Sequence, residues 1–209
     1  MLVAIYAIFI YAPVEKTLLE VQKIFYVHVG TAWNAFLAFF VVFVASVAYL
    51  RTREARWDRL GSASAEIGVM FTTLVLITGP IWARSSWNMW WTWEPRLTTT
   101  LILWFIYVAY LLIRATAGDE RRGILAAVFG IIGFVDVPIV YLSVQWWGSH
   151  PIVLGSSGGG LPASMLTALI LSVLAFTALY LYLLRKNLGI QAVEEELKQL
   201  KEELRQEYD

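Results

Sequence analysis

The chain has 209 residues, of which 59% are hydrophobic and 15% are charged, whereas a soluble domain carries about a quarter charged residues. Its 16 basic and 16 acidic residues cancel, so the net charge indicates no class of partner. The absence of cysteine excludes disulfides, thiolate chemistry, iron–sulfur clusters and covalent c-type haem within this chain, and the only imidazoles are those of His28 and His150.

Long apolar segments predict the fold class. Five of them suit membrane-spanning helices at a rise of about 1.5 Å per residue. They cover residues 29–50, 65–83, 97–113, 124–144 and 161–184. A shorter apolar segment, residues 2–12, lacks the basic start of a signal peptide, and we interpret it as a first helix that ends at Pro13. The sequence therefore predicts an all-α integral membrane protein with a bundle of about six transmembrane helices.

Basic residues divide unevenly between the two sides of the predicted bundle. One side carries 12 of them, in the loops after the second and fourth helices and in the tail, and the other side carries four. The four are Lys16, Lys23, Arg84 and Arg96. Because Lys and Arg favour the cytoplasmic side, we expect a cytoplasmic C-terminus. Segments 13–28, 84–96 and 145–160 are then expected to face outward.

The last part of the chain differs in composition from the apolar region before it. Val193, Leu197, Leu200 and Leu204 recur at spacings of 4, 3 and 4 among charged residues. This pattern predicts a short cytoplasmic helix, which is either docked through its apolar seam or simply solvated. We therefore divide the chain into a polytopic membrane domain, residues 1–184, and a charged cytoplasmic C-terminal helix, residues 185–209.

Residues 82–96 hold five of the ten tryptophans within 12 residues, together with Arg84, Glu94 and Arg96. Tryptophan prefers the membrane interface, which explains one or two rings at a helix end. Four of these rings form what we call the tryptophan shelf: Trp87, Trp90, Trp91 and Trp93. Such a cluster favours a large, flat, apolar ligand, and the two arginines can pair with anionic groups on that ligand.

Both histidines lie in or beside the segments expected to face outward. Residues 14–27 are amphipathic and predict an interfacial helix, after which His28 enters the next span. Trp146 and Trp147 precede His150 in the third outward segment. A lone histidine at this depth often only caps a helix. Two imidazoles, an aromatic shelf and outward arginines together favour haem, whose iron takes axial imidazoles and whose propionates need donors.

Residues 87–98, WNMWWTWEPRLT, resemble the tryptophan-rich WWD signature of haem-handling proteins, with Glu94 where that signature usually has Asp. The surrounding sequence resembles the cytochrome c maturation protein C family, also called haem exporter protein C. The supporting motifs are YVHVGTAW at 26–33, VPIVY at 137–141 and SVQWW at 143–147, ahead of His150. The resemblance covers nearly all of residues 1–184.

The resemblance implies a non-enzymatic subunit that binds and delivers haem for c-type cytochrome biogenesis. It implies non-covalent haem b, held at the outer face of the bacterial inner membrane and passed to a periplasmic haem chaperone (CcmE-like). It also implies ABC ATPase and membrane subunits (CcmA- and CcmB-like), a small membrane subunit (CcmD-like) and the lipid bilayer as partners, and no nucleic acid. By motif position, His28 and His150 carry over as axial iron ligands. The other expected haem contacts are Arg84, Trp87, Trp90, Trp91, Trp93, Glu94, Arg96, Trp146 and Trp147.

Asp136 supports a competing interpretation. It lies in the middle of a predicted span, two residues before Pro138, and intramembrane carboxylates are costly and often functional. The alternatives to haem delivery are therefore a proton- or solute-coupled transporter centred on Asp136, or a purely structural subunit with the tryptophans as an interfacial belt. Asp136 can equally be a hydrogen-bonded group at a helix kink or contact.

Overall fold

The structure is a computed structural model that describes residues 1–16, 18–147 and 161–208, and every regular element in those ranges is a helix. The elements in chain order are α1 (Leu2–Tyr6), η1 (Ala7–Tyr11), α2 (Gln22–Thr52), α3 (Ala55–Trp87), α4 (Pro95–Thr116), α5 (Asp119–Trp147) and α6 (Ala163–Tyr208). Helices α2 to α6 are each long and apolar enough to cross a membrane. The prediction of an all-α multi-pass membrane protein is confirmed. Its sixth segment forms only the short helices α1 and η1.

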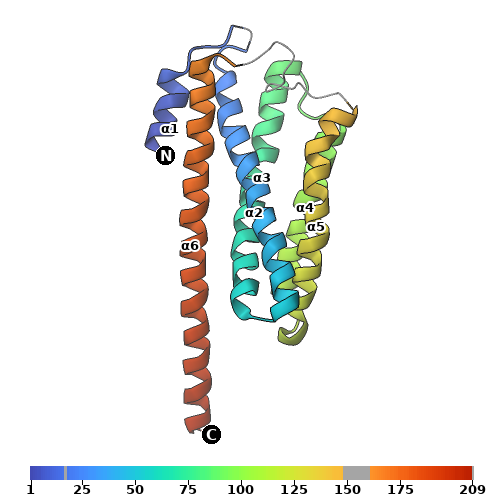
Figure 1. The fold of residues 1–209 in the computed structure, drawn as a ribbon, viewed down its shortest axis with the longest axis vertical. Helices are drawn as coiled ribbons and strands as arrows, with labels where there is room; N and C mark the ends of the chain where they lie inside the picture. The colour runs from blue at the N-terminus through green and yellow to red at the C-terminus, as the bar shows by residue number, and fades with distance from the viewer. Residues whose placement is uncertain (17, 148–160, 209) are drawn as a thin grey trace.

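Successive long helices run in opposite directions, so their connections gather at two ends of the bundle (Figure 1). We call one end the tryptophan end, where residues 88–94, the start of α2 and the last turn of α5 lie. The other is the arginine end, where residues 53–54 and 117–118 connect helices and beyond which α6 projects. The described parts of the three segments expected to face outward share the tryptophan end, as the alternating spans predict.

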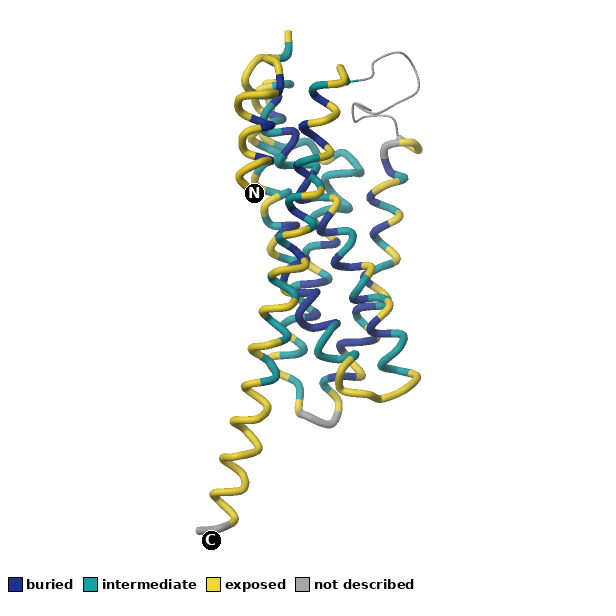
Figure 2. Tube along the Cα trace, turned by 60° about the vertical axis from the view of Figure 1, so that its left-hand side comes forward, coloured by how far each residue is buried: buried dark blue, intermediate teal, exposed yellow. Residues whose placement is uncertain are grey.

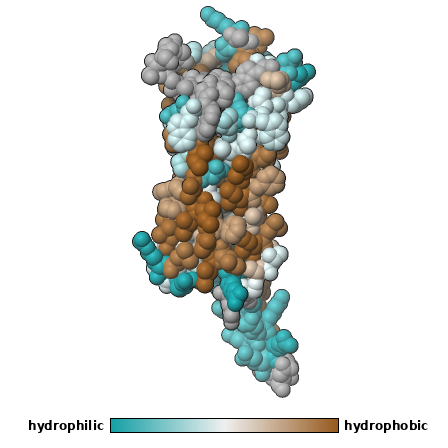
Figure 3. Space-filling view, turned by 90° about the vertical axis from the view of Figure 1, so that its right-hand side faces the viewer, coloured by the Kyte–Doolittle hydropathy of each residue, from teal (hydrophilic) through white to brown (hydrophobic). Residues whose placement is uncertain are grey.

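Helix α2 occupies the middle of the bundle and packs against α3, α5 and α6, while α4 pairs with α5, and α1 and η1 lie along α6. Aromatic rings fill the interior: the rings of Phe39 and Tyr107 stack with centroids 3.7 Å apart, and both residues are fully buried. Buried residues line the inner faces of the helices in Figure 2. Figure 3 shows a hydrophobic band on the α4 and α5 side, bounded at both ends by more hydrophilic side chains.

The predicted interfacial helix over residues 14–27 is wrong, because helix begins only at Gln22. The backbone N–H of Leu18 donates to a carboxylate oxygen of Glu15, and Leu19 adopts a left-handed conformation with φ 50°. That conformation is incompatible with a continuing right-handed helix. His28 consequently lies six residues inside α2, about 9 Å along its axis, rather than directly after a separate interfacial helix.

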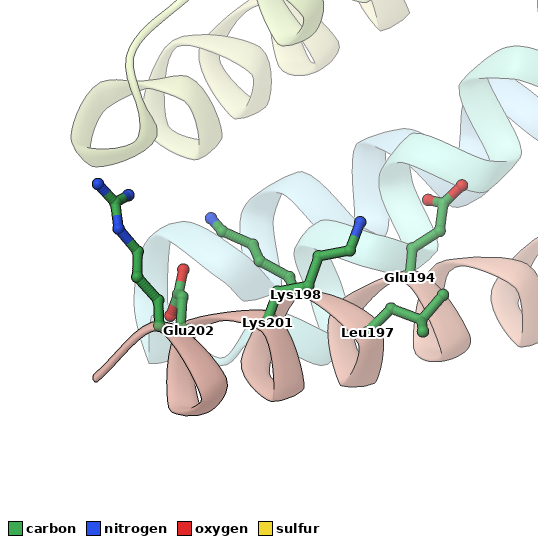
Figure 4. Close-up of a pocket in the computed structure, with 6 residues that line it drawn as sticks. Glu194, Leu197, Lys198, Lys201 and Glu202 are labelled. Atoms are coloured by element: carbon green, nitrogen blue, oxygen red, sulfur yellow. The ribbon is translucent and has the colours of Figure 1, made fainter. Parts of the chain in front are cut away.

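Helix α6 continues from the membrane segment into the charged tail, and its far part is exposed (Figure 2). Near the arginine end, Arg59 of α3 forms an ion pair with Glu195, and Asn187 donates a hydrogen bond to Glu66. Farther out, residues 193–206 are exposed, and the side chains labelled in Figure 4, among them Leu197 and Lys198, project from α6. The tail is helical as expected, and its treatment as a separate unit stays a prediction.

Candidate functional site

Helix α3 ends in a compact turn that sets the direction of the tryptophan-rich segment. Asn88 adopts a left-handed conformation, φ 59°, and its N–H donates to the carbonyl of Arg84 at 3.1 Å. The guanidinium of Arg84 in turn donates to the Asn88 carbonyl at 2.6 Å and lies 5.9 Å from the ring centroid of Trp90. Asparagine tolerates this conformation better than most residues. A side-chain clamp therefore fixes the exit from α3 and places a cation over one ring of the shelf.

The segment from Met89 to Trp93 has no regular secondary structure, and α4 starts at Pro95, one residue after Glu94. Glu94 has an extended backbone at the N-cap, Pro95 occupies the first helical turn, and Thr98 N–H donates to the Glu94 carbonyl at 3.0 Å. Proline suits this position because the first helical N–H groups have no partner within the helix. The tryptophans are thus held on a short connection between two rigid helices.

Three described rings of the shelf differ in exposure. Trp90 is 60% exposed and Trp93 is 76% exposed, whereas Trp91 is partly buried. The rings of Trp91 and Trp93 pack edge to face, with centroids 5.8 Å apart and planes at 78°. Contiguous exposed apolar surface rimmed by polar groups is typical of interaction sites. The arrangement offers area for a flat ligand, with one ring anchored and two accessible.

Buried polar atoms without hydrogen-bond partners gather in the same stretch of sequence. Among the described residues, the indole nitrogen of Trp91 and the hydroxyls of Thr92 and Thr98 are buried and have no partner. Buried polar groups normally pair with protein or water. These three groups can donate hydrogen bonds to a ligand that carries acceptors.

The two arginines at the tryptophan end, Arg84 and Arg96, have different environments. Arg84 is exposed, whereas Arg96 lies in the first turn of α4 and is partly buried. Arg84 is therefore the more accessible of the two cations for a carboxylate outside the bundle.

His28 is held from α2 against α3. Its Nδ1 lies 2.8 Å from Oγ1 of Thr78. A Cβ atom on Gly79 would come within 3.3 Å of His28 Cε1, which is tighter than most real contacts. Glycine at position 79 therefore lets the imidazole lie directly against the α3 backbone. The sequence reasoning missed both α3 residues, because nothing in one sequence pairs position 28 with position 78.

The remaining site predictions fall partly outside the described structure. His150 lies outside the described residues, so its expected contact with haem iron is untested. Trp87 is the last residue of α3 and Trp147 the last of α5, while Trp146 is 60% exposed in the final turn of α5. The tryptophans predicted to contact haem therefore lie at one end of the bundle, on the ends of α3 and α5 and on the connection to α4.

Comparison with known proteins identifies a family that this chain is similar to. The family model described as heme exporter protein C matches residues 1–203. The heme exporter protein C of Bradyrhizobium diazoefficiens is 36% identical over 165 residues, which cover 77% of this chain and 63% of that protein. The heme exporter protein C of Haemophilus influenzae is 32% identical over 194 residues, which cover 90% of this chain and 78% of that protein. The Escherichia coli heme exporter protein C is 32% identical over 140 residues, 57% of its length.

Proposed function

The chain belongs to the heme exporter protein C family, and from that premise we propose that it captures haem at the tryptophan end and delivers it for c-type cytochrome biogenesis. It is a membrane transport and delivery subunit rather than an enzyme. The observation that carries the proposal is the tryptophan shelf itself. Trp90 and Trp93 expose most of their area on a rigidly bounded connection, beside the accessible guanidinium of Arg84.

The residues at this end fit the chemistry of haem as cargo. Exposed indole rings cover the porphyrin face, because aromatic pairs gain from stacked or edge-to-face packing. Arg84 pairs with a propionate, and the unpartnered donors of Trp91, Thr92 and Thr98 serve further acceptors. His28 and His150 provide the two imidazoles for the iron of non-covalent haem b.

The orientation and partners follow from the same proposal. The tryptophan end faces the periplasm and the arginine end the cytoplasm, because basic residues favour the cytoplasmic side of the inner membrane. A periplasmic haem chaperone (CcmE-like) then receives haem at the exposed shelf. The ATPase and membrane subunits of an ABC module (CcmA- and CcmB-like) and a small membrane subunit (CcmD-like) assemble with the chain in the bilayer.

The visible spectrum of the purified protein tests the proposal. A Soret band is expected in the wild type, and His28→Ala and His150→Ala should each lower the haem content and shift the band, because no other side chain of this chain offers imidazole. A double variant with the haem content and spectrum of the wild type would refute axial ligation by these residues.

One observation favours the transporter alternative. The Oδ2 atom of Asp136, in the middle of α5, is buried and has no hydrogen-bond partner among the described residues. An intramembrane carboxylate in this state is a candidate proton or cation site. Protein that carries no haem as purified and acquires none from added hemin would favour this alternative over haem delivery.

A further inference from the structure

The contact between His28 and Thr78 determines more than the place of the imidazole ring. We propose that Thr78 is a positioning residue for haem binding: its hydroxyl accepts the Nδ1 hydrogen of His28 and so presents the Nε2 lone pair to haem iron. This inference rests on the proposed function, because it concerns the nitrogen through which His28 would bind iron.

The direction of the hydrogen bond follows from the surroundings of the threonine. The Thr78 hydroxyl has one hydrogen, and its oxygen lies 2.7 Å from the carbonyl oxygen of Leu74 in the preceding turn. Two oxygens at this distance repel each other unless a hydrogen lies between them, so the hydroxyl donates to Leu74. Oγ1 is then left as an acceptor toward His28 Nδ1, at 2.8 Å. The hydrogen between His28 and Thr78 therefore belongs to the imidazole.

A neutral imidazole carries one hydrogen, so protonation of Nδ1 leaves a lone pair on Nε2. A histidine nitrogen coordinates a metal through such a lone pair. The hydrogen bond made by the other nitrogen selects the tautomer. A histidine without a partner prefers its hydrogen on Nε2, which would block ligation there. Thr78 therefore reverses the intrinsic preference in favour of iron binding.

Two further features make this control effective. His28 is about 9 Å inside α2 and partly buried. The partly buried ring is shielded from part of the solvent, so its N–H hydrogen gains from a protein acceptor. Gly79 lets the ring approach α3 closely, since a Cβ atom there would crowd His28 Cε1 at 3.3 Å. Adjacent residues of α3 thus fix both the position of the ring and its protonated nitrogen.

Thr78→Val removes the hydroxyl and keeps the shape of the side chain, and Thr78→Ser retains the hydroxyl. Thr73→Val is a matched control on the same helix, because Thr73 also donates to a carbonyl one turn back and accepts a ring N–H, that of Trp104 at 2.9 Å. His28→Ala tests the proposed function separately. Each purified variant is titrated with hemin, and its haem-free form is labelled with ¹⁵N-histidine for NMR.

In the haem-free wild type we expect the His28 signals of an Nδ1-protonated tautomer. In Thr78→Val they should change toward Nε2 protonation, and hemin affinity should fall by about 10–100-fold, the usual cost of losing a partner that orients a metal ligand. Thr78→Ser should restore both properties, and Thr73→Val should change neither.

The inference would be overturned if Thr78→Val kept the wild-type tautomer and hemin affinity while His28→Ala lost haem. An equal loss of affinity in Thr73→Val would also overturn it, because the effect would then be general to α3. If His28→Ala itself bound hemin as the wild type does, the proposed iron ligation would fail first. The two failures are therefore distinguishable.

Discussion

Replacing Trp93 by alanine measures what one exposed ring of the tryptophan shelf contributes to haem binding. Trp93 is 76% exposed, so its removal costs the haem-free protein little packing. An indole side chain carries roughly 200 Å² of surface, of which about 150 Å² is therefore free. A flat ligand covers one face, about 75 Å², and at about 25 cal/mol per Å² this contact stabilises the complex by ~2 kcal/mol. The expected loss in hemin affinity is about 30-fold.

The assay is a hemin titration of detergent-purified protein, followed at the Soret band. Trp93→Phe should recover part of the loss, because a smaller ring still stacks and can still pack on Trp91. Trp57→Ala is the control, because Trp57 lies in the first turn of α3, near the arginine end and away from the shelf. Equal losses for Trp93→Ala and Trp57→Ala would refute the shelf, since the cost would then reflect the loss of any indole.

Two further predictions concern the arginine end. Asp58 of α3 accepts two hydrogen bonds from Arg114 of α4, at 2.6 and 2.9 Å. The side chain of Asp58 is 20% exposed and that of Arg114 is 13% exposed. Asp58→Asn should therefore destabilise the protein by about 2–3 kcal/mol, somewhat less than the loss of a fully buried ion pair. A lower thermal midpoint with an unchanged Soret position is expected, and a shifted Soret band would connect this ion pair to the haem site. Deleting residues 190–209 removes Glu195, the partner of Arg59, and should leave the haem content unchanged while weakening co-purification of an ATPase subunit. Haem loss with the ATPase retained would contradict the predicted topology.

The spans and their two ends could be predicted because hydropathy and the distribution of basic residues act over long segments. A stretch of about 20 apolar residues has few alternatives to a membrane helix, whatever the details of its packing. The position of the tryptophan segment could be predicted equally well, because the segment lies between two such spans. The structure adds local contacts that depend on the backbone conformation, such as the hydrogen bond from Arg84 to the Asn88 carbonyl.

Predictions from the spacing of residues were wrong or incomplete where a single contact decides the conformation. The amphipathic spacing in residues 14–27 predicted helix, but the Leu18 contact with Glu15 and the left-handed Leu19 end it before Gln22. The contact between His28 and Thr78 joins residues 50 positions apart, and no periodicity within one chain encodes such a pair. Conversely, α6 continues past residue 184 because no proline or left-handed residue stops it.

The arrangement of the interior bears on how haem is handled. His28 lies about 9 Å inside α2, and Phe39 is eleven residues farther along the same helix, about 16 Å deeper. There the rings of Phe39 and Tyr107 are stacked at 3.7 Å and fully buried, and Phe71 of α3 is buried as well. A dicarboxylate the size of haem cannot pass close-packed aromatic rings without opening the bundle. Haem that binds His28, as proposed, therefore enters more readily from the tryptophan end than through this interior, which favours capture at the tryptophan end over conduction by this chain alone.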